Sequence, residues 1–263
     1  MTATDLFRLD GRVAFISGAA GHLGREMAWA LGEAGATVLL NGRNANRLSA
    51  FANELEAAGI SVECVTFDMM EFSAVRQFFA SRHRLDVLIN NAVTMTPKSL
   101  AMAGPDDFDQ TYRSAVTASF EAVRAARPAL FRAARETGSA SVTNIGTMYA
   151  HVSPDPNLYS EPAQMSPPHY RAAKAGLIPL TRHLAAELGP DGIRVNAVSP
   201  GPFPKAEVAT RDPAFGARLA SRTMLGRTAN ASEIRGPILF LASAASSFVT
   251  GTVLAADGGW TAW

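Results

Sequence analysis

The stretch "RVAFISGAAGHLG" (residues 12–24) places an apolar segment directly before a glycine-rich turn, and Leu23, Met27 and Leu31 then recur at helical spacing. Backbone amides of such a turn, together with the N-terminus of the helix that follows, can receive a pyrophosphate that bulkier side chains would exclude. An ordinary strand-to-helix turn would have the same pattern. The stretch therefore predicts a dinucleotide cradle only if the rest of the chain supplies the other parts of such a site.

The rest of the chain alternates short β-rich segments with longer stretches of helical period. Strands are expected at 12–17, 37–41, 61–67, 85–90, 141–146, 193–199 and 252–256, and helices at 22–35, 45–58, 73–81, 106–135, 168–188 and 232–242. Parallel neighbours need such crossovers, and strands such as "VLIN" are apolar without alternation, as when both faces are covered. The pattern predicts an α/β fold, a doubly wound parallel sheet of about seven strands with helices on both faces, in a single domain over residues 1–263.

Composition excludes several classes of partner. The 24 Lys and Arg residues nearly balance the 23 Asp and Glu residues, so no strong field draws nucleic acid or an anionic membrane. No run of about 18 apolar residues or secretory leader is evident, and a cytoplasmic protein is expected. The single Cys64, in a strand-like segment, is expected to be a small buried hydrophobe, and no metal-ligand cluster is expected.

The loop after the second expected strand bears on the cofactor. A dinucleotide site carries, about 20 residues beyond its first turn, an acidic group for a free ribose hydroxyl or a basic group for a 2′-phosphate. In "NGRN" (residues 41–44), Arg43 stands there, which favours NADP(H) over NAD(H). The alternative is that Arg43 only solvates the start of the next helix.

The segment "YRAAK" (residues 170–174) indicates acid–base chemistry. A Tyr and a Lys four residues apart lie on one face of a helix. A cation about 4 Å away could stabilise a phenolate by roughly 4 kcal/mol, which would bring the pKa of Tyr170 from near 10 to near neutrality. Tyr170 could then donate a proton to a ketone oxygen or take one from an alcohol. Such pairs are also common on surface helices.

Several motifs together resemble the short-chain dehydrogenases/reductases, in their common single-domain branch. They are "SGAAGHLG" (17–24), "FDMM" (67–70), "NNAV" (90–93), "YRAAK", "IRVNAVSPG" (193–201) and "FLASAASSFVTGTVLAADGG" (240–259), and the likeness runs from Gly11 to Trp260. The resemblance implies a Rossmann-type fold, hydride transfer between a nicotinamide and a carbonyl or alcohol, a small-molecule substrate, and a homotetramer or dimer.

By position, the resemblance implies a set of site residues. Tyr170 is the acid/base, Thr147 replaces the family serine that steadies the substrate oxygen, and Lys174 also binds the nicotinamide ribose. The implied cofactor-binding residues are Ser17, Gly18, Gly21, His22, Leu23, Gly24, Arg43, Asn44, Asp68, Met69, Asn91, Ala92, Lys174, Pro200 and Gly201. Three alternatives stay open: Asp68 as a plain helix cap, Thr147 as a strand-end residue, and His22 as a solvated side chain rather than a donor to the phosphates.

Two features depart from the family. Ala115 stands where members carry an asparagine that helps to hold a water chain to the lysine, and the neighbouring Ser114 points about 100° away around the helix. A cofactor-binding scaffold or sensor with lost or weak catalysis therefore remains the alternative to an active enzyme. The even spacing of Gly18, Gly21 and Gly24 resembles nucleotide-sugar epimerases and dehydratases, which normally need a longer chain.

Substrate information is expected in two variable segments. Residues 151–169 form an inserted proline-rich loop whose Tyr159, Met165 and His169 could wall a sugar or sugar acid, or else contact another subunit. Residues 202–224 occupy a lid-like region. Its Lys205, Arg211 and Arg218 could meet an anionic group or simply be solvated, and Trp260 and Trp263 are expected to pack against a neighbouring subunit.

Overall fold

Seven parallel strands form one sheet in the computed structural model, which describes residues 2–161, 164–205, 207, 210 and 212–263. The strands are β1 (Val13–Ser17), β2 (Thr37–Gly42), β3 (Val62–Thr66), β4 (Val87–Asn90), β5 (Ala140–Ile145), β6 (Ile193–Pro200) and β7 (Val253–Ala256). Their order across the sheet is β3-β2-β1-β4-β5-β6-β7, and every pair is parallel. The predicted doubly wound fold is confirmed.

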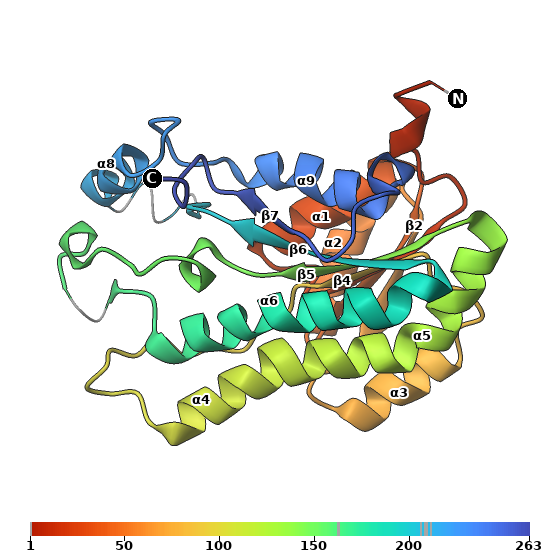
Figure 1. The fold of residues 1–263 in the computed structure, drawn as a ribbon, viewed down its shortest axis with the longest axis horizontal. Coiled ribbons are helices and arrows are strands. Elements are labelled where there is room, and N and C mark those ends of the chain that lie inside the picture. The colour runs from red at the N-terminus through yellow and green to blue at the C-terminus, as the bar shows by residue number, and fades with distance from the viewer. Residues whose placement is uncertain (1, 162–163, 206, 208–209, 211) are drawn as a thin grey trace.

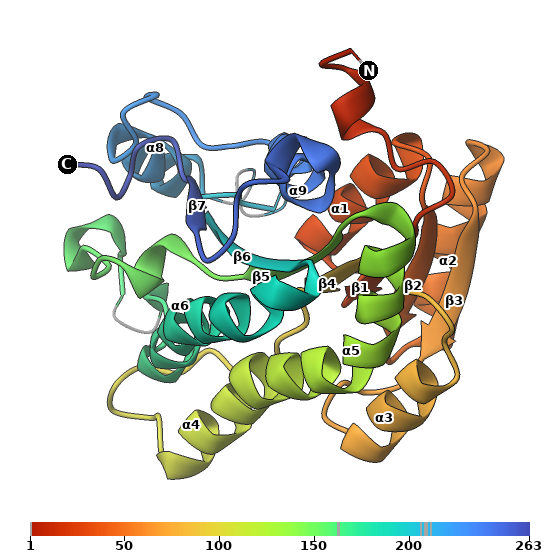
Figure 2. The same cartoon turned by 45° about the vertical axis from the view of Figure 1, so that its right-hand side comes forward.

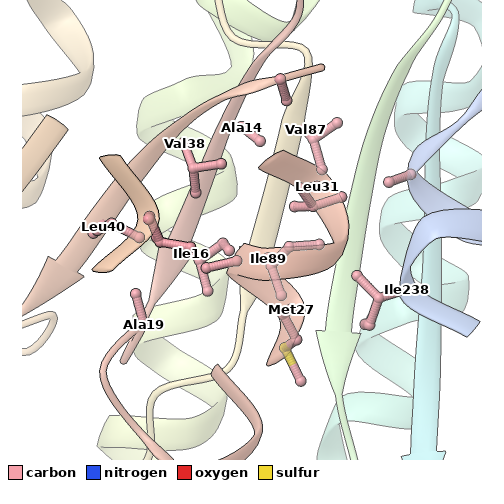
Figure 3. Close-up of a cluster of buried hydrophobic side chains, with 14 of the residues drawn as sticks. Ala14, Ile16, Ala19, Met27, Leu31, Val38, Leu40, Val87, Ile89 and Ile238 are labelled. Atoms are coloured by element: carbon pink, nitrogen blue, oxygen red, sulfur yellow. The ribbon is translucent and has the colours of Figure 1, made fainter. Parts of the chain in front are cut away.

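Helices cover both faces of this sheet (Figure 1). They are α1 (His22–Glu33), α2 (Ala45–Ala57), α3 (Phe72–Ala80), α4 (Pro105–Tyr112), α5 (Ala118–Thr137), α6 (Pro168–Leu188) and α9 (Arg235–Ala242), while α8 (Pro213–Ser221) lies beyond one end of the sheet. Alternate residues along the strands point to opposite faces of the sheet and pack into two hydrophobic cores. Ile16 packs with α1, α2 and α9, as Figure 3 shows in part, whereas Phe15 packs with α3, α5 and α6.

The helix predicted over 106–135 is interrupted. Residues Arg113–Thr117 form a π-helical turn between α4 and α5, in which the N–H of Ala118 bonds the carbonyl of Arg113. The hydroxyl of Ser114 donates to the carbonyls of Thr111 and Thr94 and accepts the N–H of Thr94. Side-chain insertion of this kind is a common cause of local helix irregularity, and π-turns concentrate at functional sites.

The strand order reverses direction between β1 and β4. From β1 the chain crosses outward to β2 and β3, and from β4 it crosses the other way to β5, β6 and β7. Ligands of open α/β sheets bind outside the carboxyl ends of the strands at such a point. Both views show α8 and the segment that follows β5 at this end of the sheet (Figures 1 and 2).

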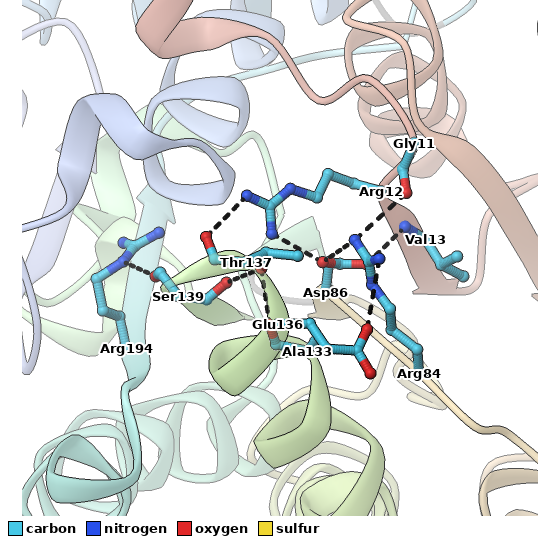
Figure 4. Close-up of polar contacts among 10 residues, drawn as sticks. All are labelled: Gly11, Arg12, Val13, Arg84, Asp86, Ala133, Glu136, Thr137, Ser139 and Arg194. Carbon is cyan, nitrogen blue, oxygen red and sulfur yellow. Dashed lines mark hydrogen bonds and ion pairs between the residues drawn. The ribbon is translucent and has the colours of Figure 1, made fainter.

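A charged hub fixes the opposite end of the sheet (Figure 4). Asp86 is 2% exposed, accepts two bonds of 2.9 Å from Arg84, one of 2.9 Å from Arg12, and the backbone N–H of Val13 at 2.9 Å. The carboxylate therefore holds the start of β1 beside the start of β4.

Two expectations about packing are wrong. Cys64 is exposed, because β3 is the edge strand and its alternate side chains face away from the core. Trp260 is not available to pack against a neighbouring subunit, because it is 5% exposed and packs within its own chain against Met148, Leu158 and Leu219. Trp263 is 67% exposed. Within the described part of the chain, no helix combines the length and apolarity that crossing a bilayer requires.

Candidate active site

The turn after β1 is shaped by its glycines. Gly18 has a φ of +66°, and a Cβ built there would lie 3.1 Å from the amide nitrogen of Asn91. A Cβ on Gly24 would lie 2.3 Å from the carbonyl oxygen of Gly18, so the turn and α1 can meet only at glycine. The N-cap of α1 is Gly21, which has no side chain to cap the helix. The amides of this helix start are thus free to meet an anion.

Ser17 joins this turn to the one after β4. Its hydroxyl accepts the N–H groups of Asn91 at 2.9 Å and Ala92 at 3.0 Å, and the side-chain amide of Asn91 donates to the carbonyls of Ser17 at 2.9 Å and Gly18 at 3.2 Å. Ser17 itself is buried and lines neither of the clefts described next. It positions the two turns at the point where the strand order reverses.

A cleft of about 420 Å³ opens beside these turns, over the ends of β1, β2 and β4. Arg43 lies in its wall with a largely exposed side chain, 3.5 Å from the carboxylate of Asp68. The side chain of Asn44 caps α2 by accepting the N–H of Arg47. Asp68 bonds the N–H of Met70 at 2.9 Å, whereas the N-cap of α3 is Glu71, so the simple helix-cap interpretation of Asp68 is wrong.

A second cleft of about 230 Å³ continues from the first, and Asn91 and Val93 line both. Thr147, Tyr170 and Lys174 all line this second cleft. Thr147 stands after β5 and starts a short 3₁₀ turn, while Tyr170 and Lys174 lie in the first two turns of α6. The structure thus brings together three side chains that are 23 and 4 residues apart in sequence.

The charges of this cleft differ from the expectation. The ammonium of Lys174 is 2% exposed and donates to the carbonyl of Ile145 at 2.6 Å, and its burial lowers the pKa of Lys174 to about 8. Burial also raises the pKa of Tyr170, and a side-chain hydrogen bond with Thr147 opposes that rise. The predicted fall of the pKa of Tyr170 to neutrality is therefore wrong.

His22 lies at the start of α1 but is not directed at the turn. Its Nε2 is 3.1 Å from the carbonyl oxygen of Phe203, in the segment after β6. The expected extra donor to the phosphates is thus engaged elsewhere, because the segment after β6 folds back over the helix start. The bond ties the glycine-rich turn to the lid-like region.

The position of the missing family asparagine is closed. Ala115 is 1% exposed in the π-helical turn and packs with Val116, Ala173 and Leu177. Its carbonyl accepts the hydroxyl of Ser119 at 2.6 Å. Ser114 lines the larger cleft, but its hydroxyl is occupied by the backbone of Thr94.

The two variable segments depart from their predicted roles, a substrate wall at 151–169 and a lid at 202–224, in three ways. His169 is buried inside the start of α6. Tyr159 bonds the hydroxyl of Tyr149 at 2.7 Å and contacts Phe215 of α8. The guanidinium of Arg218 donates to the carbonyl of Leu158 at 2.7 Å, which joins α8 to the proline-rich loop rather than leaving it for an anion. Lys205 is exposed, and Arg211 lies outside the described residues.

Apart from Ser17, every residue predicted for the site lines one of the two clefts. Further lining residues were not among the predicted site residues, namely Ala20, Asn41, Gly42, Arg47, Leu48, Phe67, Met70, Val93, Thr94, Ser114, Ile145, Gly146 and Phe203. Arg47 had a usable signal, since it is a second cation in the first turn of the helix that follows Arg43. Phe203 had none, because its place depends on the path of the chain after β6.

The residues of the two clefts fit a dinucleotide with a phosphate at its adenosine end. The glycine turn leaves room and free amides where a Cβ would close the approach, and Arg43 and Arg47 supply cations at the far end of the larger cleft. The cluster of Thr147, Tyr170 and Lys174 stands at the other end. Among the described residues no group of three or more metal-ligating side chains was found.

Comparison with known proteins agrees with this geometry. A family model described as enoyl-(acyl carrier protein) reductase matches residues 18–261. Gluconate 5-dehydrogenase of Gluconobacter oxydans is 34% identical over 99% of both chains, and galactitol 2-dehydrogenase (L-tagatose-forming) of Cereibacter sphaeroides is 32% identical over 98% of both. The crystal structure of a gluconate 5-dehydrogenase from Burkholderia cenocepacia in complex with NADP and tartrate has a TM-score of 0.86 and 32% identity, covering 100% of both chains.

The family model matches nearly the whole chain, and two relatives are more than 30% identical to it from end to end. These matches show the family to which the sheet order and the clefts already pointed. The chain belongs to the short-chain dehydrogenase/reductase family of oxidoreductases, which act on CH–OH and C=O groups.

Proposed function

We propose that this protein is an NADP(H)-dependent dehydrogenase that interconverts a secondary alcohol and a ketone on a sugar acid or polyol. One observation carries the proposal: Thr147, Tyr170 and Lys174 meet in the smaller cleft, which shares Asn91 and Val93 with the larger cleft of about 420 Å³. The alternation of buried strands and helices places both clefts at the carboxyl end of the sheet, where this fold binds nucleotides.

The proposed chemistry divides between the cofactor and three side chains. The nicotinamide, when bound, accepts or delivers the hydride. The phenol of Tyr170 gives its proton to the carbonyl oxygen during reduction and takes it back during oxidation, and the hydroxyl of Thr147 steadies that oxygen. Lys174 contributes its positive charge from a fixed place on the carbonyl of Ile145.

The pKa of Tyr170 predicts how the rates of reduction and oxidation depend on pH. Because burial raises the pKa of Tyr170, the phenol carries its proton at neutral pH and is ready to act as an acid. Reduction is therefore expected near neutrality, whereas oxidation needs the phenolate and is expected to accelerate as the pH rises.

The preference for NADP(H) rests on Arg43 and Arg47, two exposed arginines in the wall of the larger cleft. No carboxylate stands at position 43 to select a free ribose hydroxyl. A gluconate 5-dehydrogenase with 32% identity binds NADP in its crystal structure, which supports the same cofactor here.

The substrate class is inferred from the relatives, which are named for gluconate and galactitol. We further propose one catalytic domain over residues 1–263 that acts as a homotetramer or dimer in the cytoplasm, on a small molecule and without nucleic acid. A net charge of +1 supports the last point. Exposed apolar side chains such as Phe120, Phe248 and Trp263 support an oligomer.

The direct test is NADP reduction with D-gluconate and with galactitol, measured at 340 nm in the wild type, Tyr170→Phe and Tyr112→Phe. Tyr112 is an exposed tyrosine on α4 and serves as the matched control. We expect turnover in the wild type and the control, and none in Tyr170→Phe, because only Tyr170 lines the cleft. Turnover that persists in Tyr170→Phe would sink the assignment of the acid.

A second candidate is a cofactor-binding protein without turnover, which the closed position of Ala115 favours. It predicts tight NADPH binding by fluorescence with no hydride transfer to or from a panel of keto sugars, keto acids and acyl ketones. Transfer to any of them that depends on Tyr170 excludes this candidate.

A further inference from the structure

The first turn of α6, which carries Tyr170, has no side-chain cap. The helix begins at Pro168, and its N-cap is Pro167. Proline suits the first position of a helix, but the amides of His169 and Tyr170, the second and third residues, have no cap to accept them. Terminal turns open more easily than helix interiors, so the position of the phenol depends on what else holds this turn.

His169 holds it. The side chain is 1% exposed, and its Nε2 is 3.1 Å from the carbonyl oxygen of Thr96. Because a carbonyl only accepts hydrogen bonds, Nε2 must carry the proton. Nδ1 is also buried, and it has no hydrogen-bond partner in the part of the chain that the structure describes. Burying the unpaired Nδ1 is costly. The hydrogen bond from Nε2 to Thr96 offsets part of that cost.

The loop on the other side of this bond is itself fixed. Thr94 exchanges hydrogen bonds with the hydroxyl of Ser114, and farther along Lys98 pairs with Asp107 at 2.8 Å. Asp107 also accepts the N–H of Gly104, and the next residue, Phe108, places its ring edge-on to His169 with centroids 5.9 Å apart. His169 therefore links α6 to a braced segment rather than to a free loop.

That segment begins at the wall shared by the two clefts. Asn91 and Val93, three to five residues before Thr96, line both of them. A bond from His169 to Thr96 thus sets where Tyr170 lies relative to this wall. We propose that His169, whose Nε2 donates to the carbonyl of Thr96, is a positioning residue that holds Tyr170 against the cofactor-binding wall. The effect on rate rests on the proposed function, whereas the effect on the helix start does not.

The test compares His169→Leu with His169→Gln, whose amide nitrogen can replace Nε2 as donor to Thr96. His183→Gln, at an exposed position on the same helix, is the matched control. Hydride transfer is measured in a single turnover with D-gluconate and NADP. We expect His169→Leu to slow transfer on the order of 10-fold to 100-fold, as misplacement of a catalytic group by about 1 Å does. His169→Gln should keep most of the rate, and NADPH affinity should change little in either variant.

Hydrogen exchange separates this proposal from the proposed function. In the protein without cofactor, the amide of Arg171, which donates to the carbonyl of Pro167 at 3.3 Å in the first turn of α6, should exchange faster in His169→Leu than in wild type or His169→Gln, whether or not D-gluconate is a substrate. Equal exchange in the three proteins, or an equal loss of rate in the Gln and Leu variants, overturns the positioning role. If His169→Leu does not fold, His169→Met refills the space with a flexible apolar chain and carries the same prediction.

Discussion

The buried charge of Lys174 should lower the free energy of unfolding at neutral pH. Its ammonium is 2% exposed, and burial lowers its pKa from the ordinary 10.5 to about 8. Below pH 8 the lysine is charged in both the folded and the unfolded chain, and the folded chain bears the full cost of burying that charge. Between pH 8 and pH 10.5 the unfolded chain binds the extra proton, so the free energy of unfolding rises with pH.

The size of this effect follows from the pKa difference. The step from 10.5 to about 8 corresponds to about 3 kcal/mol. Substitution of Lys174 by Met removes the charge and this cost, but it also removes a hydrogen bond to the carbonyl of Ile145 worth about 1.5–3 kcal/mol. At pH 7 the two terms nearly cancel or leave Lys174→Met slightly more stable, although the variant should lose activity.

The assay is urea unfolding followed by circular dichroism at one protein concentration, from pH 7 to pH 10, on the wild type and Lys174→Met. As the pH rises, the free energy of unfolding of the wild type should increase relative to that of Lys174→Met by about 3 kcal/mol, and most of this increase should be complete by pH 10. Other groups that titrate in this range cancel in the difference. Lys205→Met, at an exposed lysine, is the control and should show no such trend. A flat difference between wild type and Lys174→Met would refute the reasoning.

Three further outcomes follow from other parts of the structure. Arg43→Ala should raise the Kd for NADPH about 10-fold to 100-fold, the loss of one charged hydrogen bond, and leave that for NADH unchanged in fluorescence titrations; equal effects on both cofactors would contradict the 2′-phosphate role. Asp86→Asn should lower the free energy of unfolding by about 3 kcal/mol, because Arg12 and Arg84 lose a buried partner, while leaving NADPH affinity intact; an unchanged urea midpoint would show that the hub is dispensable. Ala115→Asn should cost about 1–3 kcal/mol, since Ala173 and Leu177 close that position; an unchanged or raised stability would reveal spare room for the amide.

The sequence predicted the fold well because its signals are local and repeated. The apolar strand before Gly18, the unbroken apolar run of β4 and the helical spacing of α1 each report burial within a few residues. The π-helical turn at Arg113–Thr117 was missed, because it depends on the bonds between Ser114 and the distant Thr94. Cys64 was misjudged since a strand-like pattern does not say which strand forms the edge of the sheet.

The sequence predicted which residues line the site better than it predicted the contacts that those residues make. The spacing of Tyr170 and Lys174 placed both on one face of α6, yet it did not show that Lys174 bonds the carbonyl of Ile145. Glycine spacing located the turn after β1, but His22 reaches Phe203, nearly 200 residues away in sequence. His169 was assigned to a substrate wall and Arg218 to an anion or to solvent, because their partners, Thr96 and Leu158, are joined to them only by the tertiary fold.

The exposed edge position of Cys64 makes this chain convenient to label. It is the single cysteine of the sequence, and it stands on β3, while the residues proposed for proton transfer follow β5 and lie on α6. A maleimide dye or a tether to a surface can therefore be attached at one defined point, with no thiol to remove first. Burial of part of the side chain raises the pKa of the Cys64 thiol, so coupling should be slow at pH 7 and faster in mildly alkaline buffer.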